Sequence, residues 1–404
     1  MSNVNSNIIY QAGTLLADVV QQATGRKVLT ASTPGEWTSV AQSALSAGVE
    51  PVLNVLVNMW SRTIFSVRPY SAKLKGLEMS AERFGLMTRK LSPVAKDPGD
   101  DAAYLWPVAY DAGQSPATGD GHSVDMYAIS KKQVLQTGFA GAAVYQEIFT
   151  IFKDQLDGAF QSADEFMAFN EMQMADRSNS IESWKENVKR SLLANMILSL
   201  NAENQSGRVV HLISEYNTDT GAQLTSTTVF APENFPSFVR WMVARFNTLA
   251  RMMSERTAMF QTTISGIYVL RHTPAQDLRV YITGRFKDMM DTMALSVTFN
   301  DQYLKMADVE GINFWQAPNS PSSVTGKPTY TNNSGVATTP GEASTVNNIV
   351  GVMFDRDALG MASILEESAL TPYNVKGRYW NNAYNNKFKT RFDMTEKAVL
   401  LLLD

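Results

Sequence analysis

The feature that most constrains this chain is a long run of helical periodicity near its middle. The apolar side chains that mark one face at helical spacing are Phe166, Phe169, Met172, Ile181, Trp184, Val188, Leu192 and Met196. Such spacing indicates amphipathic helix. Asn179 followed by Glu182 matches an N-cap and its capping-box acid, so we expect a second helix to begin there. Together the two helices predict one long helical element, about 30 Å for every twenty residues.

Length and residue usage exclude several classes of protein. The 404 residues allow two subdomains or one elongated body with insertions. Cysteine is absent, which excludes disulfides, thiolate nucleophiles and cysteine-ligated metal centres, and fits a reducing cytosol. No basic start followed by an apolar core opens the chain, so we expect no secretory signal. The most apolar window, residues 49–65, is too short and polar to cross a bilayer, so we expect no membrane anchor.

The charge balance bears on possible partners. The 35 Lys and Arg against 39 Asp and Glu leave a net charge of −4, which argues against a protein whose main task is gripping phosphates. Charged residues are only 18% of the chain, which also holds 20 Met and 7 Trp. Interfaces between proteins are depleted in charge and enriched in aromatic residues and Met. The composition therefore favours a surface that other chains bury.

Two segments near the N-terminus have no core of their own. Residues 1–65 predict an arm that docks on the body or on a neighbouring subunit, through an amphipathic helix that includes Trp60. Residues 84–91 indicate a strand, and the Pro, Gly and Asp clusters of residues 93–130 predict a long two-stranded hairpin with a mobile tip. A loop of this length is either functional or disordered.

The rest of the chain predicts a compact α+β unit followed by return strands. We expect strands at RVVHLISEY, SGIYVLR and LRVYIT, a helix opened by Pro236 and a short helix at residues 285–295. Residues 317–348 are rich in Ser, Thr, Asn, Gly and Pro, which predicts a surface excursion that contributes nothing to the core. The closing AVLLLLD indicates a buried central strand.

Residues 373–392, YNVKGRYWNNAYNNKFKTRF, interleave aromatic, Asn and basic side chains. This run is compatible with a nucleic-acid groove, a platform for sugars or a strand held in a large assembly. Its second half alternates, which predicts a strand with one buried face and one basic, solvated face. The buried set is Phe388, Thr390, Phe392 and Met394, and the solvated set is Lys387, Lys389, Arg391 and Asp393.

No motif for catalysis or cofactor binding is present. Gly326 and Lys327 lack the upstream glycine of a phosphate-binding loop, and the three histidines are far apart. Asp355 and Asp357 flank Arg356 as in some metal sites, but acids at the start of a loop or helix are the commoner arrangement. We therefore predict no catalytic, cofactor-binding or metal-binding residue, and no enzymatic activity.

The order of these segments resembles that of the major capsid proteins of tailed bacteriophages, which have the Hong Kong 97 fold. GVMFDRDALGM followed by SALTPYNVKGRYWNNAYNNKF is similar to the closing segment of phi-29-like podophage head proteins. DQLDGAFQSADEFMAFNEMQMADRSNSIESWKENV is similar to the segment that forms their spine helix. The resemblance covers most of residues 84–404. Its matching residues in the tail are Asn374, Gly377, Tyr379, Trp380 and Asn381.

The resemblance implies an α+β, Hong Kong 97-like capsid fold with a peripheral and an axial domain. The implied division is an N-terminal arm at 1–65, the start of the peripheral domain at 66–92, an extended loop at 93–130, the peripheral domain with its spine helix at 131–206, the axial domain at 207–348 with a low-complexity insertion at 317–348, and peripheral return strands at 349–404.

The resemblance also implies a function. A protein of this kind self-assembles from hexamers and pentamers into an icosahedral phage head, in the host cytoplasm, with a portal, a possible scaffolding protein and double-stranded DNA bound without sequence specificity. The expected inter-subunit anchors are Trp60, Tyr104, Trp106 and Tyr110. The expected residues of the peripheral strand are Tyr379, Trp380, Asn381, Lys387, Lys389 and Arg391. No cofactor is implied.

Three other functions stay open from the sequence. An encapsulin-like compartment would have the same fold but hold protein cargo. A saccharide-binding or saccharide-cleaving protein would stack the aromatic residues of 373–392 on sugars. A nucleic-acid-binding module would use the basic residues of the same stretch, although the net charge weakens this hypothesis.

Overall fold

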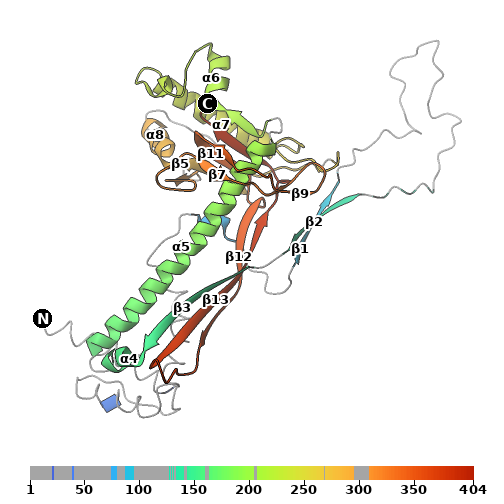
Figure 1. Ribbon diagram of the computed structural model, residues 1–404. Helices are drawn as coiled ribbons and strands as arrows, with labels where there is room; N and C mark the ends of the chain where they lie inside the picture. Colours follow the sequence, from blue (N-terminus) through green and yellow to red (C-terminus); the bar gives the residue numbers. More distant parts are fainter. Residues whose placement is uncertain are drawn as a thin grey trace, which may run out of the picture.

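A computed structural model of the chain places its secondary structure in a compact body and a long extension (Figure 1). It describes residues 74–79, 87–94, 133–140, 143–159, 163–203, 207–267, 269–294 and 309–404, with residues 21, 39–40, 127, 129 and 131 besides. Nearly all of the arm at 1–65 and most of the loop at 93–130 lie outside the described residues, so their predicted structure is not tested.

A five-stranded mixed sheet forms the centre of the body, in the order β4-β14-β11-β5-β6. Strand β11 pairs antiparallel with both neighbours, whereas β4 and β6 pair in parallel at the two edges. The strands are β4 Val209–His211, β5 Leu278–Thr283, β6 Val309–Ile312, β11 Ile349–Asp355 and β14 Ala398–Leu402. The described residues of β11 and β14 are all buried, which confirms the predicted central strand near the end of the chain.

Both faces of this sheet are covered because its central strands are apolar on both sides. On one face, alternate residues such as Val399 and Leu401 pack among helices of the body. On the other, Leu400 and Leu402 pack against the C-terminal end of the longest helix. The helices are α6 Leu212–Thr220, α7 Phe235–Ser254 and α8 Gly284–Ala294 on the first face, and α5 Ala163–Glu203 on the second.

Helix α5 has 41 residues and is about 60 Å long at 1.5 Å per residue. Its C-terminal end belongs to the body, and the rest runs out beside a second, three-stranded sheet (Figure 1). That sheet has the order β12-β13-β3. Its elements, with the short helix that joins β3 to α5, are β3 Ala143–Phe152, α4 Lys153–Ala159, β12 Leu359–Leu370 and β13 Tyr379–Phe392.

A buried ion pair fixes the end of α5 to the body. The Arg208 side chain is fully buried and donates to Glu203 Oε2 and to Thr262 Oγ1, both at 2.6 Å. It also donates to the carbonyl of Met394 at 3.3 Å. Burial lowers the pKa of Arg208 to about 10, while the adjacent Glu203 carboxylate favours the charged form. The pair thus joins α5 to two loops of the body.

Several predicted boundaries are wrong. Helix α5 is continuous through Asn179, so this residue caps no helix, because the N–H groups that a cap would satisfy are already bonded within the helix. The prediction of one long helical element is confirmed. The predicted strand RVVHLISEY ends at His211, after which Leu212, Ile213 and Tyr216 are buried at helical spacing in α6.

Two other segments also differ from expectation. The described residues of SGIYVLR form isolated bridges and no strand; the bridges link Ile264 to Ile267 and Thr257 to Arg271. The excursion at 317–348 folds into short strands and contributes Val324 and Val346 to the core, because these two residues face α5. Its strands are β7 Val324–Gly326, β8 Tyr330–Thr331, β9 Ala337–Thr338 and β10 Ser344–Val346.

Strand β1, Met87–Pro93, pairs antiparallel with β2, Val134–Ala140, which confirms the base of the predicted hairpin. Short 3-10 helices occupy Lys75–Leu77 and Thr228–Phe230. Within the described ranges, no helix combines the length and the apolar character that a membrane crossing requires.

The central sheet generates the first prediction. A Cβ added to Gly351 in β11 would lie 2.7 Å from the carbonyl oxygen of Tyr281 in β5, and that backbone cannot retreat from a paired strand. We expect Gly351→Ala to lower the free energy of unfolding by about 1 to 3 kcal/mol, measured by denaturant titration. Gly341→Ala is the control, since nothing lies within 4 Å of its Cβ position. Equal stability of the two variants would contradict the strand pairing.

Candidate interaction surface

The three-stranded sheet of the extension separates two faces. Strand β13 is its middle strand and pairs antiparallel with β12 and β3. Successive residues of β13 alternate between a side that faces α5 and a side that faces away, as side chains of a strand do. The α5 side carries Trp380, Asn382, Tyr384, Asn386 and Phe388, all of them buried.

The contact between α5 and this sheet is aromatic and polar. The Arg177 guanidinium of α5 lies over the rings of Phe149 and Tyr384, 5.2 and 4.8 Å from their centroids, and donates to Ser368 Oγ at 3.1 Å. Two turns further along α5, Trp184 stacks on Tyr145 of β3, with ring centroids 4.3 Å apart. These contacts hold the helix against the sheet by stacking and charge-assisted bonds.

Burial perturbs the ionisable groups of this contact. It raises the pKa of the Glu147 carboxyl, although the adjacent Arg177 opposes the shift. It lowers the pKa of Arg177 itself, again against the pull of Glu147. Burial also raises the pKa of the Tyr384 hydroxyl, and the nearby Glu366 carboxylate adds to the increase. The groups therefore stabilise each other in a site that disfavours isolated charge.

The opposite side of the sheet, which we call the open face, carries a different set of side chains. Cross-strand register groups them in rows, since residues directly opposite in a ladder share a face. The rows are Leu365, Lys387 and Val144, then Glu367, Asn385 and Gln146, then Ala369, Ala383 and Ile148, then Asn381 and Thr150, and finally Tyr379 and Phe152. Rows that contain apolar side chains thus alternate with two polar rows.

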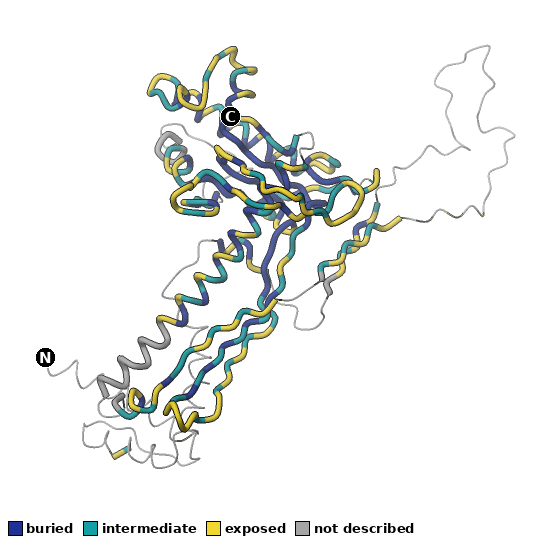
Figure 2. The backbone as a smooth tube through the Cα atoms, viewed as in Figure 1, coloured by how far each residue is buried: buried dark blue, intermediate teal, exposed yellow. Residues whose placement is uncertain are grey.

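Exposure on the open face is high for apolar side chains. Val144 is 62% exposed and Ile148 57%, while Phe152 and Leu365 are 46% and 52% exposed. In Figure 2 teal and yellow predominate along the extension, whereas dark blue is concentrated in the interior of the body. Apolar exposure gathered on one face in this way marks a contact surface for another molecule. The chemistry suits association better than catalysis.

The structure places the predicted residues of the peripheral strand on both faces. Trp380 is buried against Tyr373, with ring centroids 4.5 Å apart, whereas Tyr379 and Asn381 face away from α5. Asn381 Oδ1 accepts a bond from Thr150 Oγ1 at 2.7 Å, across the sheet. The predicted aromatic and Asn run is therefore part core and part surface.

The predicted basic face is only partly correct. Lys387 lies in a row of the open face, but Arg391 pairs with Asp357 at 2.7 Å. Lys389, two residues after Lys387, is half-buried on the same side of the strand. Asp393 was expected among the solvated residues and is buried, because the strand ends before it and the chain turns into the body. Thr390, expected to be buried, is exposed.

Other predicted residues have a structural role or lie outside the described residues. Asp355 accepts bonds from Thr273 Oγ1 at 2.7 Å and from the backbone N–H of Asp357 at 2.8 Å, which supports the structural interpretation of this pair. The expected anchors Trp60, Tyr104, Trp106 and Tyr110 are not among the described residues.

Sequence reasoning missed the exposed residues of β3. The stretch AVYQEIFTIF places Val144, Ile148 and Phe152 on one side and Tyr145, Phe149 and Ile151 on the other. Both sides are apolar, so the strand lacks the simple alternation that reveals a half-exposed strand. The available signal was the pair of polar residues Gln146 and Thr150, which lie four positions apart and therefore on the same face of a strand.

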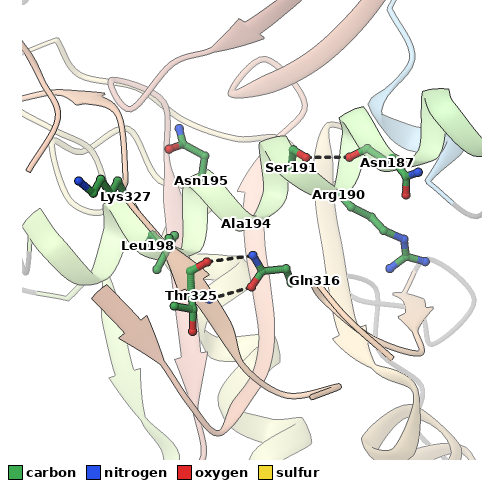
Figure 3. A pocket seen from close by; sticks show the side chains of 10 residues that line it. Asn187, Arg190, Ser191, Ala194, Asn195, Leu198, Gln316, Thr325 and Lys327 are labelled. Carbon is green, nitrogen blue, oxygen red and sulfur yellow. Dashed lines mark hydrogen bonds between the residues drawn. The ribbon is translucent and has the colours of Figure 1, made fainter. Parts of the chain in front are cut away.

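A groove of about 500 Å³ lies between α5 and β7 (Figure 3). The Gln316 side chain donates to the carbonyl of Thr325 at 2.9 Å and accepts from its N–H at 2.8 Å. Asn195 makes the same pair of bonds with Thr329, at 2.9 and 2.8 Å. Both amides therefore occupy backbone groups that a further strand would need, so the groove is closed to strand addition.

Solved structures identify the class of protein that has this fold. A chain of the capsid structure of Staphylococcus phage Andhra superposes with a TM-score of 0.51 at 11% identity, over 83% of this chain and 84% of that chain. A chain of the structure of head fiber and inner core protein gp22 of native bacteriophage P68 gives 0.52 at 10% identity, over 83% and 85%. The fold is that of a phage capsid protein, which confirms the expected α+β, Hong Kong 97-like class.

The sequence itself narrows the assignment. The profile of the Phi29-like phage major capsid protein family matches residues 18–401, and the chain belongs to that family. No curated protein matches it significantly. The chain is therefore a phage major capsid protein, a structural component of the virion capsid that associates with its own copies. The resemblance drawn from the tail is confirmed, and the compartment, saccharide and nucleic-acid alternatives are not favoured.

The two faces of β13 generate a prediction about stability. Trp380 is 2% exposed, so Trp380→Ala removes a large buried ring and leaves a cavity. We expect a loss of about 3 to 5 kcal/mol in the free energy of unfolding, measured by denaturant titration of the unassembled chain. Tyr379→Ala is the matched control on the neighbouring, half-exposed position and should cost clearly less. An unchanged midpoint for Trp380→Ala would mean that the ring is not core.

Proposed function

We propose that copies of this chain associate as hexamers and pentamers and close an icosahedral head around double-stranded DNA. The observation that carries the proposal is the open face, which exposes apolar residues on an extension far from the main core (Figure 1). A monomeric function gives no reason for this exposure, whereas a lattice buries it between neighbours. Each contact can then be weak, because it is repeated around the shell.

The open face is proposed to lie against a neighbouring copy. Its apolar side chains supply the area that is buried on association. Lys387, in the row of Leu365 and Val144, and Glu367, in the neighbouring polar row, supply charges of both signs. Charges at the rim of an interface orient partners more than they add affinity. A surface of this composition suits an identical subunit held at a fixed register.

The two N-terminal segments are proposed to act as clasps. Residues 94–133 connect β1 to β2 and therefore start and finish at the end of the hairpin where Pro93 pairs with Val134. They contain Tyr104, Trp106 and Tyr110, and the arm at 1–65 contains Trp60. Aromatic residues of this kind contribute much of the binding energy at protein interfaces. We propose that they anchor each subunit on its neighbours.

Packaged DNA is proposed to be confined without sequence-specific contacts. A net charge of −4 provides no strong electrostatic grip on phosphates. A container benefits from this balance, since tightly bound DNA could not be packed or released. We further propose assembly in the host cytoplasm with a portal and a scaffolding protein, and no enzymatic activity.

Loss of the loop tests the clasp. The purified chain, with a scaffolding protein where one is needed, should form closed shells visible by electron microscopy. Deleting residues 93–130 keeps the pairing of Ser92 with Leu135, so the subunit should fold with unchanged helix content by circular dichroism. We expect this variant to form no stable closed shells. Normal particles from the deletion variant would refute the clasp.

The open face is tested by charge insertion. Ile148→Asp places a carboxylate in an apolar row of the open face. Because Ile148 is 57% exposed, this change should leave the thermal unfolding of the unassembled chain unchanged. It should abolish shells, because association would bury an unpaired charge. Val336→Asp, at 58% exposure in the 317–348 excursion, is the matched control and should still assemble. Equal assembly of the two variants would remove the open face from the interface.

A further inference from the structure

The β1–β2 hairpin meets the body through one of its faces. Lys90 and Ser92 alternate with Arg89 and Leu91 along β1, and the burial of Ser92 contrasts with the 65% exposure of Leu91. Lys90 and Ser92 therefore point toward the body, while Arg89 and Leu91 point away from it. The inward face is polar, so packing of apolar side chains is not what orients this strand.

Four charged side chains gather where the hairpin meets the body. Lys90 Nζ donates to Asp393 Oδ2 at 2.7 Å and also to Glu396. Arg271 donates to the same oxygen of Glu396, Oε1, and to Ser92 Oγ at 2.9 Å. Two cations thus face two carboxylates, and β1 contributes one cation and one acceptor to the cluster.

The Asp393 carboxylate of this cluster makes further bonds within its own turn. Asp393 and Glu396 lie in the tight turn that joins β13 to β14. Asp393 Oδ1 accepts bonds from the N–H of Thr395 at 2.9 Å and from its hydroxyl at 2.6 Å, and Arg271 donates to the same hydroxyl oxygen at 3.1 Å. The hairpin is therefore tied to the joint between the extension and the central sheet.

Burial makes the pairing of these charges necessary. It would by itself raise the pKa of Asp393, but the Lys90 ammonium and the bonds from Thr395 outweigh it and hold the pKa below its usual value. Burial raises the pKa of Glu396 despite Lys90 and Arg271, and nearby Asp355 adds to the increase. Without Lys90, the turn would keep two buried carboxylates and one cation, which is costly.

We propose that this four-charge cluster is a latch that fixes the angle between the β1–β2 hairpin and the body. Because residues 94–133 are attached to the hairpin at the pair of Pro93 and Val134, the latch also fixes the position and orientation of their two attachment points. The use of that orientation in assembly rests on the proposed function. The latch itself is a property of the single chain and can be tested without assembly.

The natural absence of cysteine allows a direct measurement. Spin labels on Gln136→Cys, on the outward side of β2, and on Arg240→Cys, an exposed position of α7, report the hairpin-to-body distance by pulsed electron paramagnetic resonance. The unassembled parent chain should give one narrow distance distribution. Lys90→Met should broaden it or add a second population, because the hairpin loses its ionic attachment.

Matched variants separate the latch from general damage. Arg89→Met removes an exposed cation from the same strand and should leave the distribution narrow, and Lys90→Arg should restore it. Lys90→Met combined with Glu396→Gln leaves one cation and one anion, so this variant should fold even where the single variant does not. A narrow, unshifted distribution in that folded double variant would overturn the latch, whether or not the chain forms shells.

Discussion

The structure depends on the double role of α5. Its C-terminal end lies on one face of the central sheet, where Met196, Ile197 and Leu200 are fully buried. Its preceding turns carry the three-stranded sheet of the extension through Arg177 and Trp184. One continuous helix therefore connects the two parts, and the buried ion pair of Glu203 with Arg208 attaches its C-terminal end to the body.

The two parts of the molecule are held by different forces. The body is a sheet between two apolar layers, so its stability comes mainly from the burial of hydrocarbon. The extension has one covered face with polar, stacked contacts and one open face with exposed apolar residues. The apolar body therefore provides most of the stability of the folded subunit, while the open face of the extension keeps its apolar side chains exposed.

Charge is used sparingly and in defined places. The cluster around Lys90 and the pair of Arg208 with Glu203 both lie near the joint between body and extension. Buried pairs of this kind add little net stability compared with apolar packing, but they penalise other arrangements because each one would leave a charge alone. Their position indicates that they define the relative placement of elements.

The sequence by itself determined the long helix and the buried closing strand. The residues around Trp380, which resemble the family's closing segment, also determined the family. These features depend on local spacing or on contiguous residues, which a single sequence displays. It did not determine which side of β13 faces α5, nor that β3 lies beside it, because strand register depends on partners far along the chain. The excursion at 317–348 and the N-cap at Asn179 were misjudged for the same reason, since local composition says nothing of what packs against it.

Only the tertiary structure decided which residues form the open face and the charge cluster around Lys90. Ile148 meets Ala383 in one row, and Lys90 meets Asp393 across 303 positions of sequence, so neither group exists until the chain has folded. The physical reason is that exposure and charge pairing are properties of a position in space. The sequence supplies the side chains, but the packing of the helix against two sheets decides which of them remain free to meet another copy.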